Sequence, residues 1–101
     1  MKAPNLRTRI LNAGMRVKYC KYRVVAVGFD RVGNLIGIKT NAPRLQARGW
    51  HAEERLIHSL PRSLGLIRIA RLGAAGDFMP IDPCEHCMKI ARERGIQIER
   101  Y

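Results

Sequence analysis

Helical and strand-like hydrophobic patterns alternate along the chain, and this order most restricts the folds it can adopt. Helical spacing covers about 5–19, 50–60 and 83–94, and β-rich runs cover 22–30, 35–41, 66–70 and 96–101. A Gly-Asn turn at 33–34 joins the first two runs as an antiparallel hairpin. Helices between the later strands imply crossover connections, so those strands should be parallel. We predict an α/β fold with three α/β/α layers and a mixed sheet of about four strands.

Proline and glycine residues predict where the helices end. Pro61 stops or kinks the second helix. Pro83 suits the first turn of the third helix, for which Asp82 is a good N-cap, and Gly95 ends that helix.

Length and cysteine content bound the class of protein. The 101 residues suffice for one modest core, so we expect residues 1–101 to form a single domain. The longest apolar run, VVAVGF, is far shorter than the ~20 residues of a membrane helix, and the N-terminus lacks the apolar stretch of a secretory signal. Three cysteines cannot all pair, and two of them lie only three residues apart. We expect a soluble cytoplasmic protein that makes no membrane contact.

The net charge of +11 is concentrated in the first half of the chain. Residues 1–50 hold 11 Lys/Arg and one acid, whereas residues 51–101 hold 8 Lys/Arg and 7 acids. This asymmetry favours a polyanionic partner or a phosphorylated substrate, although arginines that only maintain solubility would give the same pattern. Arg44 and Arg48, in the loop before the second helix, are candidate phosphate or nucleic-acid contacts. The alternative for both is a solvated loop arginine.

One histidine and two cysteines are spaced so that they can share a metal ion. Cys84 and Cys87 open one helix, and His51 opens the preceding helix, whose N-terminus should emerge at the same edge of the sheet. Nitrogen and sulfur donors suit zinc, and three protein ligands with an open fourth position are typical of catalytic sites. His58 lies about 10 Å further along its helix than His51. His86 points elsewhere if both sulfurs converge, so neither histidine completes the tetrahedron easily.

Glu53 supplies a carboxylate next to this set. Two residues after His51, it can reach a water at the open position and act as a general acid and base. The alternatives are a structural zinc site or a coincidental Cys-x-x-Cys.

The two motifs together resemble the signature of the zinc-dependent cytidine deaminase superfamily. They read His51-Ala52-Glu53 and Pro83-Cys84-Glu85-His86-Cys87. The resemblance covers the element order from about residue 5 onward and implies a cytidine deaminase-like core. It implies Zn²⁺ as the cofactor, the ligands named above, and Glu53 as the residue that moves the proton. It also implies that Asn41 contacts the substrate's sugar, and that backbone amides near Ala52 and Cys84 orient the water and the base.

Two aromatic residues near the motifs are further candidate substrate contacts. Trp50 either stacks on a base or anchors the loop against the core. Phe78 either lines the pocket or caps the core.

The resemblance implies hydrolytic deamination of a nucleobase, with zinc activating the attacking water. We favour cytosine in a nucleoside or nucleotide such as cytidine or (d)CMP. One alternative is a deaminase of cytosine or adenine in single-stranded DNA or RNA, which the basic first half supports. Another is a non-catalytic, zinc-stabilised module for nucleic-acid binding or assembly. Family members continue past the last predicted strand, so we expect a C-terminally short member whose open sheet edge favours a homo-oligomer.

Overall fold

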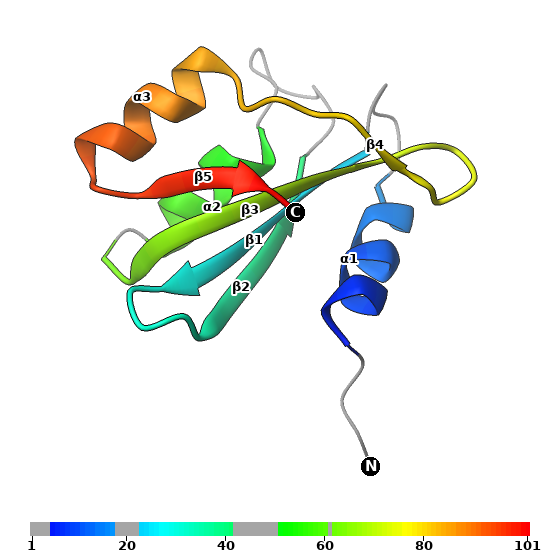
Figure 1. Ribbon diagram of the computed structural model, residues 1–101, viewed down its shortest axis with the longest axis horizontal. Helices are drawn as coiled ribbons and strands as arrows, with labels where there is room; N and C mark the ends of the chain where they lie inside the picture. The colour runs from blue at the N-terminus through cyan, green and yellow to red at the C-terminus, as the bar shows by residue number, and fades with distance from the viewer. Residues whose placement is uncertain (1–4, 18–22, 42–50, 61) are drawn as a thin grey trace.

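The computed structural model describes residues 5–17, 23–41, 51–60 and 62–101, and its elements follow the predicted order with one addition (Figure 1). They are α1 (Leu6–Met15), β1 (Arg23–Asp30), β2 (Leu35–Thr40), α2 (Ala52–Ser59), β3 (Leu64–Leu72), β4 (Phe78–Met79), α3 (Glu85–Glu93) and β5 (Gln97–Arg100). The addition is β4, a two-residue strand in the segment predicted to be a loop.

The strands form one mixed sheet. β1 pairs antiparallel with both β2 and β3, and β4 pairs antiparallel with the end of β3 at Arg71 and Leu72. β5 pairs parallel with β3, from Leu66 opposite Gln97 to Ile69 opposite Arg100. The predicted hairpin is confirmed, and so is the parallel pairing of the two strands that α3 connects.

Apolar residues on the two faces of the sheet form two separate cores. The larger core joins α2 and α3 to one face and comprises Ala26, Ala52, Leu56, Ile57, Leu64, Ile67, Ile69, Ala91 and Ile96. The smaller core packs α1 against the other face and comprises Ile10, Val25, Val27 and Ala70. Since successive strand residues point to opposite faces, β1 and β3 contribute to both cores. Helices therefore cover both faces, which confirms the α/β/α layering; α2 lies behind the strands in Figure 1.

Glycines allow α1 and α2 to approach the sheet closely. A Cβ added to Gly14 of α1 would lie 2.2 Å from Cδ1 of Leu72. One added to Gly28 of β1 would lie 2.6 Å from Cδ2 of Leu64 and 2.9 Å from Cδ2 of Leu56. The absence of a Cβ at Gly14 and Gly28 therefore permits the short distance between each helix and the sheet.

The prediction that Asp82 caps α3 is wrong. The helix begins at Glu85, and its N-cap is Cys84, whose Sγ accepts a hydrogen bond of 3.3 Å from the backbone N–H of Cys87. Asp82 instead accepts a hydrogen bond from the guanidinium of Arg100. The predicted helix end is confirmed, because Gly95 follows α3 with φ +68°, a left-handed conformation that glycine adopts without strain.

No helix in the described part of the chain is long and apolar enough to cross a membrane.

Candidate metal centre

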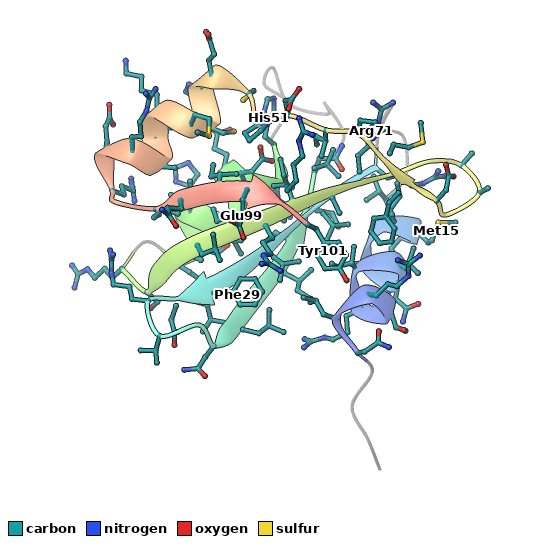
Figure 2. The ribbon with its side chains drawn as sticks, in the orientation of Figure 1. Met15, Phe29, His51, Arg71, Glu99 and Tyr101 are labelled. Carbon is teal, nitrogen blue, oxygen red and sulfur yellow. The ribbon has the colours of Figure 1, made fainter. Side chains whose placement is uncertain are left out.

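The predicted metal ligands lie at the N-terminal ends of α2 and α3. His51 is the N-cap of α2, Cys84 is the N-cap of α3, and Cys87 lies in the first turn of α3. Both helices pack on the same face of the sheet, so their first turns meet above it. Figure 2 shows His51 beside the beginning of α3, far from Phe29 at the hairpin end of the sheet.

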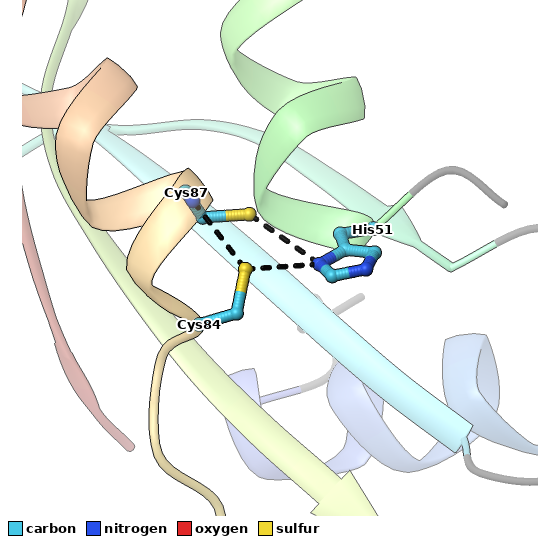
Figure 3. Close-up of side chains that lie close together, drawn as sticks. All are labelled: His51, Cys84 and Cys87. Atoms are coloured by element: carbon cyan, nitrogen blue, oxygen red, sulfur yellow. Dashed lines mark hydrogen bonds between the residues drawn. The ribbon is translucent and has the colours of Figure 1, made fainter. Parts of the chain in front are cut away.

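The three side chains converge through one imidazole nitrogen and two sulfurs (Figure 3). Nδ1 of His51 lies 3.2 Å from Sγ of Cys84 and 3.5 Å from Sγ of Cys87, and all three atoms lie within 4.8 Å of one another. Zinc–sulfur and zinc–nitrogen bonds of about 2.3 and 2.0–2.1 Å in a tetrahedron place nitrogen and sulfur about 3.6 Å apart. The donor types and their separations therefore fit zinc.

The surroundings of the three donors differ from one side of the site to the other. Cys87 is fully buried, Cys84 is half-buried and His51 is exposed. The N–H of Cys87 points at the sulfur of Cys84, and the dipole of α3 also favours negative charge there. The helix end is therefore suited to a thiolate ligand at Cys84.

Glu53 lies beside these donors in the first turn of α2. Its exposed fraction is only 4%, and it is the only buried charged residue in the described part of the chain. Burial raises the pKa of the Cys87 thiol well above its usual value, and the negative charge of Glu53 raises it further. The carboxylate is thus close enough to act electrostatically on a ligand sulfur.

The end of β2 forms another part of this region. The side-chain oxygen of Asn41 accepts a hydrogen bond of 3.0 Å from the N–H of Val24, and its backbone N–H donates to the carbonyl of Val24. One turn after His51, Arg55 donates to the carbonyl of Thr40 at 2.6 Å. Asn41 thus extends the pairing of β1 and β2 by one residue, close to the start of α2. The contact of Asn41 with a substrate sugar stays a prediction.

Phe78, another predicted contact, lies on the α1 side of the sheet. Phe78 packs against the smaller core on the α1 side, stacks on Tyr101 with ring centroids 5.5 Å apart, and lies beneath the guanidinium of Arg7. Its predicted substrate contact is untested. Trp50, Arg44 and Arg48 fall in 42–50, outside the described residues.

No protein-family model matches the sequence, and a sequence search of curated proteins finds no match. Solved structures do match. Cytidine deaminase from Mycobacterium leprae has a TM-score of 0.62 at 22% identity, over 92% of this chain and 82% of that chain. Cytidine deaminase from Burkholderia pseudomallei has 0.65 at 18%, over 94% and 78%. The dCMP deaminase of cyanophage S-TIM5 has 0.58 at 12%, over 99% and 100%. This chain has the cytidine deaminase-like fold.

Within this deaminase-like fold, sequence reasoning missed a hydrogen bond between the two ligand-bearing helices. Nε2 of His86 lies 2.9 Å from Oε1 of Glu54. The sequence offers one signal for it, because each residue is adjacent to a motif residue in the first turn of its helix. The signal is weak, since local spacing does not give the rotation of α2 relative to α3.

Proposed function

We propose that the protein is a zinc-dependent hydrolytic deaminase that acts on cytosine in a nucleoside or nucleotide such as cytidine or (d)CMP. The observation that carries the proposal is the convergence of His51, Cys84 and Cys87 beside the buried carboxylate of Glu53. Three ligands of this kind would hold zinc and leave its fourth position open. Bound zinc supplies a nucleophile at neutral pH by lowering the pKa of a coordinated water.

Glu53 is assigned the proton transfers. Its carboxylate takes a proton from the attacking water and delivers a proton to the departing amino group, so that cytosine and water give uracil and ammonia. Burial favours this role, because a carboxylate held out of bulk water exchanges its proton with the reactants rather than with solvent.

Backbone groups at the two helix starts are assigned the orientation of the water and the base. The first N–H groups of α2 and α3, near Ala52 and Cys84, lack partners within their helices and favour negative charge nearby. Asn41 is assigned to the sugar, Trp50 and Phe78 to substrate contacts, and Arg44 and Arg48 to a phosphate.

Support for a cytidine or (d)CMP substrate comes from the neighbours in fold, which include cytidine deaminases and a dCMP deaminase. We expect catalysis by a cytoplasmic homo-oligomer.

One observation favours a second candidate, a deaminase of single-stranded DNA or RNA. Helix α1 and its C-cap expose Arg7, Arg9 and Arg16, and the helix contains no acid, in a half of the chain that carries a charge of +10. Counterion release would make activity on a strand fall steeply with salt, whereas activity on (d)CMP would change little. Comparing both substrates between low and moderate salt separates the two candidates.

The test of the proposed chemistry is Glu53→Gln, which keeps the shape of the side chain and removes its proton transfer. We expect uracil formation from cytidine, dCMP or a cytosine-containing strand to fall by about 10²–10⁴-fold, with the zinc content unchanged. Glu85→Gln is the matched control, because Glu85 is an exposed acid in the first turn of α3. Full activity of Glu53→Gln would refute the assigned role. Inactivity of the zinc-loaded wild type on every base would favour a non-catalytic module.

A further inference from the structure

A polar contact joins α2 to α3 beside the candidate metal centre. Oε1 of Glu54 and Nε2 of His86 lie 2.9 Å apart. The side chain of Glu54 is 17% exposed and that of His86 is 64% exposed, so the contact extends from the edge of the packed region to the surface.

Each partner lies within one helical turn of the metal-binding side chains at the start of its own helix. Glu54 follows His51 by three residues in α2, and His86 lies between Cys84 and Cys87 in α3. The contact therefore spans the same gap between helices as the metal ligands.

Apolar contacts between these two helices constrain their relative rotation only weakly. Fully buried alanines, Ala52 of α2 and Ala91 of α3, belong to the core that the helices share. Small apolar side chains allow close approach, but dispersion contacts have little directional preference. A hydrogen bond is directional, and its strength falls steeply when donor and acceptor are misaligned. The polar pair can therefore hold the first turns in register where the alanines cannot.

We propose that Glu54 and His86 are positioning residues that hold the N-termini of α2 and α3 at the separation one zinc ion requires. The inference rests on the zinc site of the proposed function and adds two residues to it. Neither side chain is a metal ligand; they act by fixing the donor separations of 3.2 and 3.5 Å from His51 to the two sulfurs. Mutation of residues that orient metal ligands typically weakens metal binding by about 10–100-fold.

The test measures metal affinity, with Co²⁺ as a spectroscopic probe and Zn²⁺ by competition with a chelator. The variants are Glu54→Ala, His86→Ala, the double alanine variant and Glu54→Gln, whose amide oxygen still accepts a hydrogen bond from His86. Glu85→Ala is the matched control, since it removes an exposed acid next to His86 in the same turn.

We expect each single alanine variant to bind both metals about 10–100-fold more weakly, with altered thiolate–Co²⁺ absorption. The double variant should bind no more weakly than the weaker single, because both substitutions break the same contact. Glu54→Gln and Glu85→Ala should keep nearly wild-type affinity and spectrum. The urea midpoint of the metal-free protein should barely change, because the pair is partly exposed.

Two results would overturn the inference. One is wild-type Co²⁺ affinity in both single alanine variants, and the other is an effect in the double variant equal to the product of the two single effects. Because the measured quantity is metal affinity, the variants test the role of Glu54 and His86 whether or not the protein deaminates any base. A wild-type protein that binds neither metal would refute the zinc site and this inference together.

Discussion

Replacing Leu56 by alanine should destabilise the protein strongly, because Leu56 anchors α2 to the sheet. Its side chain is fully buried in the larger core. Cδ2 of Leu56 lies 2.9 Å from the Cβ that Gly28 would carry, and Cδ1 lies 3.3 Å from the Cβ that Gly37 would carry. The leucine thus fills the space above two residues without side chains, and neither glycine can fill the cavity that its loss would leave.

The expected loss combines a transfer term with a cavity term. Removing three buried carbons costs about 2–2.5 kcal/mol at ~0.8 kcal/mol each. Incomplete collapse around the glycines brings the total to about 3–4 kcal/mol, within the range of buried leucine-to-alanine substitutions. For 101 residues the entropy of unfolding is about 0.2 kcal/mol per kelvin, so Tm should fall by roughly 15–20 °C.

Urea and thermal denaturation followed by circular dichroism measure this loss. Val32→Ala is the control, because Val32 is 87% exposed and its truncation should change stability by less than about 0.5 kcal/mol. A second comparison tests the cavity itself. In the Leu56→Ala background, the added methyl of Gly28→Ala enters the vacated space, so the double variant should be about 1 kcal/mol more stable than the two single effects predict. A loss below about 1 kcal/mol for Leu56→Ala, or strict additivity, would refute the proposed packing of α2 on the glycines.

Three further predictions concern other parts of the molecule. Gly14→Ala should lower the free energy of unfolding by about 1–3 kcal/mol despite alanine's helix propensity, because its Cβ would lie 2.2 Å from Leu72; an unchanged urea midpoint would contradict this. Hydrogen bonds from the backbone and side chain of Asn34 hold the pKa of Asp30 in the folded protein below its usual 3.8. Their contribution to stability is therefore complete above about pH 3.8 and is lost as the pH falls through the pKa of the folded protein. Asn34→Ala removes only the side-chain hydrogen bond, so an NMR titration should show a partial rise of the Asp30 pKa, and equal values in both proteins would exclude the side-chain contribution. Glu53→Gln should raise the Tm of the metal-free protein, because functional residues are often kept at a cost in stability and the buried charge is removed; a lower Tm would indicate a structural role.

The fold was predictable from the sequence where one pattern decided one element. The Gly-Asn turn predicted the β1–β2 hairpin, and residues 30–34 close it through hydrogen bonds from the backbone N–H groups of Val32 and Asn34 to Asp30. The position of β4 was not predictable, because two residues carry no periodicity and their pairing depends on where β3 ends. Asp82 failed as an N-cap for a related reason. Its carboxylate is engaged by Arg100, a partner distant in sequence that no local pattern indicates.

The candidate site also has a part that could be predicted from the sequence and a part that could not. His51, Cys84 and Cys87 could be predicted to meet, because helix starts on one face of a sheet emerge at a common edge and the residue types restrict the chemistry. The contact between Glu54 and His86 could not, since it depends on the rotation of one helix against another. That rotation depends on contacts between residues far apart in the chain, which no local pattern gives.

The burial of Glu53 also bears on the choice between a catalytic and a structural zinc site. Two thiolates and one imidazole already neutralise a zinc ion, so a purely structural centre gains nothing from another negative charge nearby. In the metal-free protein that charge raises the pKa of the Cys87 thiol beyond the effect of burial. A buried carboxylate brings a structural centre no benefit, because burying a charge costs free energy. In a hydrolytic centre the same carboxylate is needed within reach of the reacting water. The position of Glu53 therefore favours a catalytic zinc site over a structural one.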